Sequence, residues 1–265
     1  GGLNRPERII RKAGDAAVDA AATRTTWSKG ESRVFLSGRI DVGMFFLKPR
    51  ISFGYGKPHF RWIGVDFNPV VSQSGIDLYT GLRFALPSVD LRIGGRYHYS
   101  FRRAYLERSG RYTRDDIDIV DFENANYFNF EAELSYGLSL GPGALFGETA
   151  VTYTTGVPDG LNLYEETMRV VIEPPWVGRQ RLGYAFAFGF NGALSLGPVV
   201  EFLYLPGRED FVFRAGLVAR LKLFDDLDAR ASFIPALATP DNLGLRGGDS
   251  FLIGARWRWA TGLPE

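Results

Sequence analysis

From about residue 33 to residue 259, apolar and polar side chains alternate along most of the chain with a period of two. The stretch 89–102, VDLRIGGRYHYSFR, has apolar, glycine and aromatic residues at odd positions and mostly charged or polar ones at even positions. Because successive side chains of a strand point to opposite faces, this pattern predicts one long strand. At roughly 3.3 Å per residue it would exceed about 40 Å, whereas strands of soluble domains have about 5 to 6 residues. A tilted transmembrane strand, which needs about 9 to 11 residues, fits this length better.

The same alternation predicts an all-β fold, a transmembrane antiparallel up-and-down barrel of about twelve strands that occupies residues 33–265. Short turns, as at Pro87-Ser88 and Asp225-Asp226, alternate with mostly longer links, among them 68–75, 103–125 and 156–180. This asymmetry is typical of outer-membrane barrels, and an even strand number places both termini at the end with the short turns. The strands are predicted at 33–46, 50–56, 59–67, 76–86, 89–102, 126–140, 144–155, 181–191, 194–205, 211–223, 227–237 and 250–259.

The apolar face of each strand is expected to point outward. The strands at 126–140, 181–191 and 250–259 each carry an apolar face rich in aromatic side chains. The opposite face is charged on nearly every strand, and packing such a face into a soluble core would bury unpaired charges at a cost of several kcal/mol each. A soluble lipocalin-type barrel would have the reverse polarity. The aromatic residues expected to face lipid include Tyr97, Tyr99, Phe101, Trp257 and Trp259.

Residues 1–32 have a different pattern. Pro6 suits a first helical position, and apolar residues then recur at helical spacing, which predicts a short helix from about Pro6 to Ala22. This segment is interpreted either as a periplasmic helical extension or as a plug in or under the barrel mouth. It lacks the apolar core of a secretory signal, so the chain is expected to be a mature or trimmed form.

Between Arg33 and Trp259 the chain resembles bacterial outer-membrane β-barrel proteins as a class. The resemblance implies an outer-membrane location with both termini in the periplasm, and contact with outer-membrane lipids and lipopolysaccharide. The formal net charge of +1 gives no reason to expect a nucleic-acid partner. With no cysteine, and with His59 and His98 far apart in sequence, no zinc site is expected. No cofactor is expected either, because phosphate-cradling glycine motifs are missing from the sequence.

Charged residues on the inward face have two interpretations. They pair across strands in a purely structural role, or they line a pore with a transverse field that selects solutes. In the second interpretation, glutamates of the strands at 126–140 and 144–155 lie roughly opposite basic residues of the last three strands. The leading hypothesis is a narrow polar-lined channel or transporter for small polar or anionic solutes. The alternative is a structural barrel that docks a periplasmic or envelope partner in a multiprotein complex. Small inward residues at 183–189 favour a cavity. The predicted pore-lining residues are Arg92, Arg96, His98, Arg102, Glu131, Glu133, Glu148, Arg214, Arg220, Lys222, Arg230, Arg256 and Arg258.

A third hypothesis is lipid hydrolysis. His98 and Ser100, separated by one residue, resemble the His-x-Ser element of outer-membrane phospholipase A and of the lipid A deacylases, in which the histidine accepts the proton of the serine hydroxyl. The match departs from those families at Phe101, where they have asparagine, and at Tyr112, near the place of their third residue. The alternation also turns the pair inward, away from lipid, so a non-enzymatic role is favoured.

The link at 103–125 is rich in acidic residues. Its carboxylates are of the kind that calcium prefers, but their spacing is not that of an EF-hand loop. A solvated outer loop is therefore the favoured interpretation. The acidic residues are Asp115, Asp116, Asp118, Asp121 and Glu123.

Overall fold

The computed structural model describes residue 27 and residues 31–43, 46–72, 74–101, 103–118, 124–189 and 193–262. The helix expected between Pro6 and Ala22, as extension or plug, lies outside the described residues, as does Arg102. Trp27 is buried, with its ring edge-on to that of His59 at 4.6 Å between centroids.

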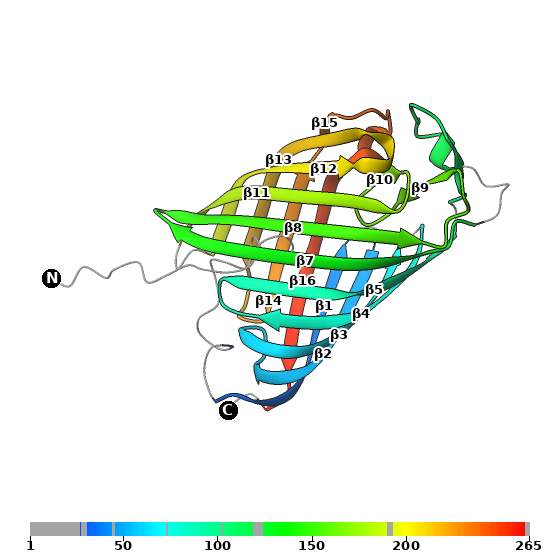
Figure 1. The fold of residues 1–265 in the computed structure, drawn as a ribbon. Coiled ribbons are helices and arrows are strands. Elements are labelled where there is room, and N and C mark those ends of the chain that lie inside the picture. The colour runs from blue at the N-terminus through cyan, green and yellow to red at the C-terminus, as the bar shows by residue number, and fades with distance from the viewer. Residues whose placement is uncertain are drawn as a thin grey trace.

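Twelve strands form a closed antiparallel barrel, which confirms the predicted fold class (Figure 1). Each barrel strand pairs with its neighbours along the chain, and β1 pairs with β16 to close the ring. The short strand β15 (Ala236–Ala238) follows β14 after Pro235 and continues its pairing with β13. The barrel strands are β1 (Arg33–Gly43), β2 (Phe46–Lys57), β3 (Arg61–Ser72), β4 (Gly75–Ala85), β5 (Val89–Ser100), β7 (Tyr127–Leu140), β8 (Gly143–Thr155), β11 (Trp176–Phe188), β12 (Leu194–Leu205), β13 (Asp210–Lys222), β14 (Leu227–Ile234) and β16 (Asp249–Ala260).

Two predicted links are wrong in part. The link expected at 68–75 is mostly strand, because β3 runs through Pro69 to Ser72 and Pro69 is paired with Leu78 of β4. Proline interrupts the usual strand pattern, which hid this extension. The link expected at 156–180 ends earlier than predicted, since β11 begins at Trp176. It also contains two strands, β9 (Leu161–Glu165) and β10 (Val170–Ile172).

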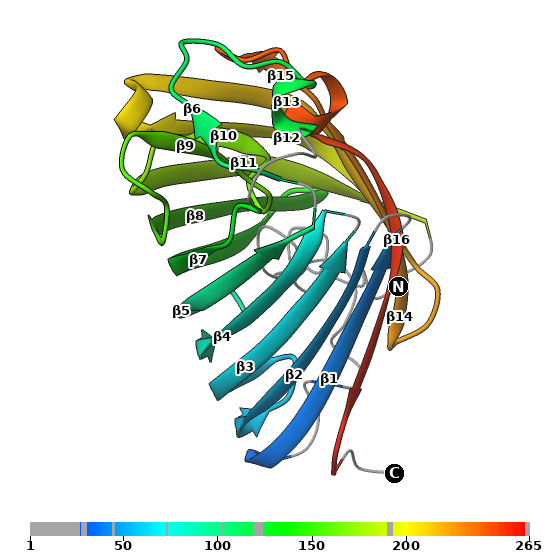
Figure 2. The same cartoon turned by 90° about the vertical axis from the view of Figure 1, so that its right-hand side faces the viewer.

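The two ends of the barrel differ. The turn end carries only short connections among the described residues, such as those between β4 and β5 and between β7 and β8, and there β1 begins and β16 ends. The loop end carries the long connections and also two short ones, between β1 and β2 and between β3 and β4. There β9 pairs with β10 and with β6 (Leu106–Glu107) in a separate three-stranded sheet that lies across the ends of β11 and β12 (Figure 2). We call residues 161–172, from β9 to β10, the hairpin.

The two faces of the wall have opposite character. In β5 the outward side chains of Ile93 and Tyr97 are exposed, whereas the inward side chains of Asp90, Arg96 and His98 are buried. The other barrel strands repeat this alternation. Among the described residues, no helix has the length and apolar character needed to cross a bilayer.

Candidate functional site

The inner face of the wall from β5 to β13 is cross-linked by ion pairs between adjacent strands. Arg96 Nε of β5 lies 2.5 Å from the carboxylate of Glu131, which is two residues along β7 from Asn129, the register partner of Arg96. Each glutamate on this part of the wall contacts at least one guanidinium group. A separation into an acidic and a basic wall, on which the transverse field depended, is therefore absent from this part of the described barrel. The remaining pairs are Arg92–Glu133, Arg179–Glu148, Arg181–Glu201 and Arg214–Glu201.

The wall formed by β13, β14, β16 and β1 holds more arginines than carboxylates among its described residues. Asp228, fully buried, is shared by three guanidinium groups: Arg258 at 2.7 Å, Arg230 at 2.6 Å and Arg220 at 3.2 Å. Asp41 is shared in the same way by Arg256 and by Arg39, the latter at 3.0 Å. Five guanidinium groups therefore surround two carboxylates. We call this set the arginine wall.

All predicted pore-lining residues that the structure describes lie on the inner face. Sequence reasoning did not single out several of their partners, which follow the same inward alternation: Asp41, Arg179, Arg181, Glu201 and Asp228. Of the expected lipid-facing aromatics, four are exposed on the outer face, and Trp259 is half-buried, lying across Gly38 of β1. The exposed ones are Tyr97, Tyr99, Phe101 and Trp257.

Space expected next to the small residues of β11 is filled. A Cβ atom at Gly183 would lie 2.1 Å from the ring of Phe146, a fully buried residue of β8. Phe146 packs with Ala185, Val199 and other apolar side chains in a cluster on the inner face. The expectation of a cavity at Gly183 is therefore wrong, because an aromatic side chain from the neighbouring strand occupies the room that the glycine leaves.

The hairpin covers the inside of the loop end. Its inward side chains, among them Leu163 and Ile172, are fully buried against Val177, Leu203 and Val212 of the barrel wall. Its opposite side carries Tyr164 and Val171, which pack with apolar residues of the outer links. The mouth at this end thus has three layers: barrel wall, hairpin and outer links. The outer-link residues in that cluster are Leu106, Tyr112, Ile117 and Leu243.

Arginine side chains anchor the hairpin through its backbone. Arg214 donates from Nη2 to the carbonyl oxygens of Met168 and Arg169, at 2.8 and 2.9 Å. Arg208 donates to the carbonyl oxygen of Val171 at 3.1 Å. Arg103 binds a hairpin side chain instead, that of Glu166, at 2.6 Å. These bonds orient the hairpin, whereas the apolar packing supplies most of the area buried on its inner side.

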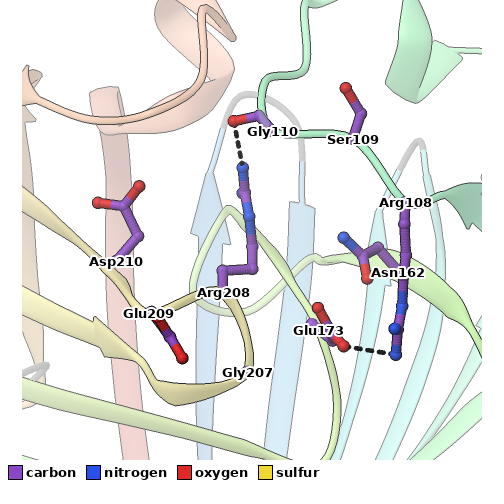
Figure 3. Close-up of a pocket in the computed structure, with 9 residues that line it drawn as sticks. All are labelled: Arg108, Ser109, Gly110, Asn162, Glu173, Gly207, Arg208, Glu209 and Asp210. Atoms are coloured by element: carbon purple, nitrogen blue, oxygen red, sulfur yellow. Dashed lines mark hydrogen bonds and ion pairs between the residues drawn. The ribbon is translucent and has the colours of Figure 1, made fainter.

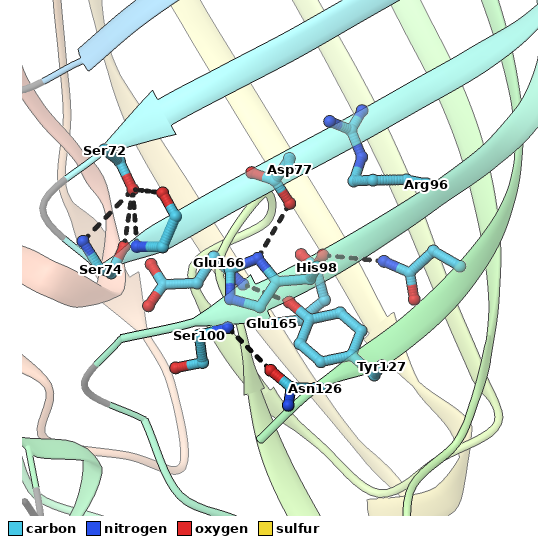
Figure 4. A network of polar contacts seen from close by, with 12 residues as sticks. Ser72, Ser74, Asp77, Arg96, His98, Ser100, Asn126, Tyr127, Glu165 and Glu166 are labelled. Carbon is cyan, nitrogen blue, oxygen red and sulfur yellow. Dashed lines mark hydrogen bonds and ion pairs between the residues drawn. The ribbon is translucent and has the colours of Figure 1, made fainter. Parts of the chain in front are cut away.

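His98 and Ser100 lie near the loop end of β5, both buried (Figure 4). His98 Nδ1 bonds the Asp77 carboxylate at 2.9 Å, and its ring stacks on Tyr127 at 4.8 Å. The Ser100 hydroxyl donates to the carbonyl oxygen of Arg103 and accepts from the N–H of that residue. Among the described residues, His98 Nε2 has no hydrogen-bond partner. A histidine–serine hydrogen bond is thus missing here, and the pair is enclosed rather than presented to lipid.

Glu165 in the hairpin is a buried carboxyl group with an uncharged set of donors. It accepts hydrogen bonds from the Met168 N–H at 2.5 Å and from Asn129 Nδ2 at 3.0 Å. Burial raises the pKa of the Glu165 carboxyl to about 7, and the nearby carboxylates of Glu131 and Asp77 add to this effect.

No protein-family model matches the sequence, and no curated protein matches it. Omp33 of Acinetobacter baumannii has a similar structure, with a TM-score of 0.40 and 12% identity over 86% of this chain and 99% of that one. The NanC porin gives a TM-score of 0.38 with 8% identity, over 86% and 98%. A loop-deletion form of OmpT from Vibrio cholerae gives 0.36 with 8% identity, over 86% and 99%.

These similarities are low, whereas the strand pairing and the two faces of the wall define the architecture directly. A closed barrel satisfies its backbone hydrogen bonds internally, and this one presents apolar side chains outward and charged ones inward. The chain has the architecture of a closed transmembrane β-barrel.

The outer links of this barrel form a pocket of about 380 Å³ at the loop end (Figure 3). Arg108 pairs across it with Glu173 at 2.5 Å, and Arg208 binds Asp241 through both terminal nitrogens. Because each arginine already has an acidic partner, the pocket shows no built anion site. In the acidic link, Asp121 and Glu123 lie outside the described residues. Asp116 accepts hydrogen bonds from Thr113 in a local turn, and no group of metal-ligating side chains occurs among the described residues.

Proposed function

We propose that this barrel is a narrow polar-lined channel or transporter for small solutes, with a preference for anions. The observation that carries the proposal is the arginine wall, where, among the described residues, five guanidinium groups lie against the carboxylates of Asp41 and Asp228. Positive charge on a low-dielectric wall raises the local concentration of anions. The proposal places both termini in the periplasm, with the turn end facing that compartment and the hairpin closing the outer mouth.

Reversal potentials across planar bilayers in a potassium chloride gradient test this preference. The unaltered protein is expected to favour chloride over potassium. Arg230→Gln removes one guanidinium group from the set that shares Asp228, and it is expected to shift selectivity toward cations by a few-fold. Arg230 suits the test because its side chain is more exposed than its neighbours, at 17%. Arg61→Gln is the control, because Arg61 is exposed at the turn-end start of β3 and lies outside the arginine wall. Equal selectivity in Arg230→Gln and the control would contradict the proposal.

A structural barrel that docks an envelope partner is the second candidate, because the hairpin packs between the inside of the wall and the outer links at the loop end. Replacing residues 159–172 with a short Gly-Ser linker separates the two candidates. For a channel, conductance is expected to rise with this replacement, because the cover of the mouth is removed. If conductance stays absent in this variant, and also after deletion of residues 1–26, the structural role is favoured.

A further inference from the structure

The carboxyl of Glu165 differs from the other buried carboxyls of the described chain in having no cationic partner within 4.0 Å. Asp66, Asp77 and Asp90 have an arginine or histidine neighbour at that distance. The same holds for Asp41, Glu148, Glu201, Asp228 and Asp241. A buried carboxylate without a positive partner is costly when ionised, so this position favours the neutral acid. The hairpin thus holds an acid whose ionisation opposes its own burial.

Glu165 also lies where the hairpin meets the wall. One carboxyl oxygen accepts from Met168 N–H within the hairpin, and the other accepts from Asn129 of β7. Releasing the hairpin would move this carboxyl from a buried site into water. We propose that protonation of Glu165 controls docking of the hairpin, so that the loop-end mouth is closed in acid and released near neutral pH. The inference concerns regulation of the proposed channel. Its physiological meaning rests on the proposed function, whereas the docking of the hairpin does not.

The surroundings of Glu165 determine whether docking of the hairpin strengthens or weakens as pH rises. Ionisable neighbours come from several elements, and negative and positive groups partly offset one another. The pKa of the Glu165 carboxyl, about 7 when docked, lies above its ordinary value of 4.5. Docking is therefore strongest below about pH 4.5 and weakens as pH rises to about 7, by on the order of 100-fold in the docking equilibrium. The ionisable groups around it are Asp77 of β4, Arg96 and His98 of β5, Tyr127 and Glu131 of β7, Arg214 of β13, and Glu166 and Arg169 of the hairpin.

Cysteine labelling measures docking without any reference to conduction. The chain contains no cysteine, so Met168→Cys introduces a single thiol at a buried position on the inner side of the hairpin. Maleimide labelling in detergent, normalised at each pH to an exposed Ser109→Cys thiol, reports the released fraction. Labelling of Met168→Cys is expected to rise on the order of 100-fold between pH 4.5 and 7 and to level off above pH 7.

Glu165→Gln, made in the same background, supplies the decisive variant. A glutamine side chain can accept from the Met168 N–H through its oxygen and donate from its NH2 group to the Asn129 oxygen once the Asn129 amide is turned over, but it carries no proton to lose. Labelling is expected to stay slow and independent of pH. Glu166→Gln is the matched control: Glu166 is the residue next to Glu165 and pairs with Arg103, so its loss is expected to make labelling faster overall but to keep the pH dependence.

Two outcomes would overturn the inference: a flat pH profile in the parent, or a profile in Glu165→Gln that follows the parent. If Met168→Cys fails to fold, hydrogen exchange of the Arg169 amide, which bonds the Glu165 carbonyl, gives the same readout in the unaltered chain. pH-dependent labelling without conductance would remove the proposed channel but leave the hairpin switch intact. Conductance with pH-independent labelling would do the reverse.

Discussion

The barrel wall and the hairpin are held by different chemistry, although both face the same interior. In the wall, buried carboxylates and guanidinium groups pair across adjacent strands, as Arg214 and Glu201 do. In the hairpin, apolar side chains such as Leu163 fill the contact with the wall, and arginines bind backbone carbonyl oxygens. Breaking an ion pair of the wall leaves a buried charge without its partner. Releasing the hairpin mainly exposes apolar surface and one ionisable acid. The wall is therefore expected to stay folded under conditions in which the hairpin can detach from it reversibly.

Removing the shared carboxylate of the arginine wall is expected to have the largest effect on stability. Asp228→Asn leaves three guanidinium groups, two of them buried, without their common anion, and breaking a buried pair costs about 3 to 5 kcal/mol. Urea unfolding in detergent, followed by heat-modifiable gel migration, measures this loss. Asp225→Asn is the control, because its pair with Lys222 is half exposed and worth about 0 to 1 kcal/mol. Equal losses in both variants would show that wall pairs contribute no more than surface pairs.

Truncating the apolar contact of the hairpin is expected to release it while sparing the wall. Leu163→Ala removes a fully buried side chain from the cluster with Val177 and Leu203, at a cost of about 2 to 5 kcal/mol. Hydrogen exchange is expected to quicken at residues 161–172 and stay unchanged in β7 and β12. Faster exchange throughout the barrel would instead show that hairpin and wall unfold as one unit, and the contrast between them would fail.

The barrel was predictable from sequence because alternation is a local signal. Each side chain of a transmembrane strand faces either lipid or the interior. The alternation in 89–102 therefore predicts the strand, and the face of each residue, without any information from distant parts of the chain. The same rule placed the charged residues on the inner face. Strand ends were harder to predict where proline interrupts the pattern, as at Pro69 in β3.

Which charged side chains pair across strands, and how the long links fold, were harder to predict from the sequence. Glu148 is paired by Arg179, which lies 31 residues away in sequence and becomes its neighbour only through the register of β8 and β11. The hairpin sequence has the alternation of any short strand, and nothing local indicates that it folds against the inner wall. Phe146 likewise fills the space beside Gly183 because of a register that spacing alone does not reveal.

The smallest expected effect comes from Ser100→Ala, at the point where the wall gives way to the outer links. The Ser100 hydroxyl bonds both backbone groups of Arg103, and Arg103 in turn binds Glu166 of the hairpin and the carbonyl oxygen of Ile117. Losing these bonds is expected to cost about 0.5 to 1.5 kcal/mol, felt as faster hydrogen exchange at residues 103–107. Ser109→Ala, at an exposed position, is expected to change stability by less than about 0.5 kcal/mol.

The Ser100 hydroxyl bonds Arg103 and not His98. Ester hydrolysis measured with phospholipid vesicles is therefore expected to be the same in the parent and in Ser100→Ala. A hydrolytic rate that is present in the parent and lost in Ser100→Ala would instead place the serine in an active site, and the boundary between wall and hairpin would then be a site of chemistry as well as of attachment.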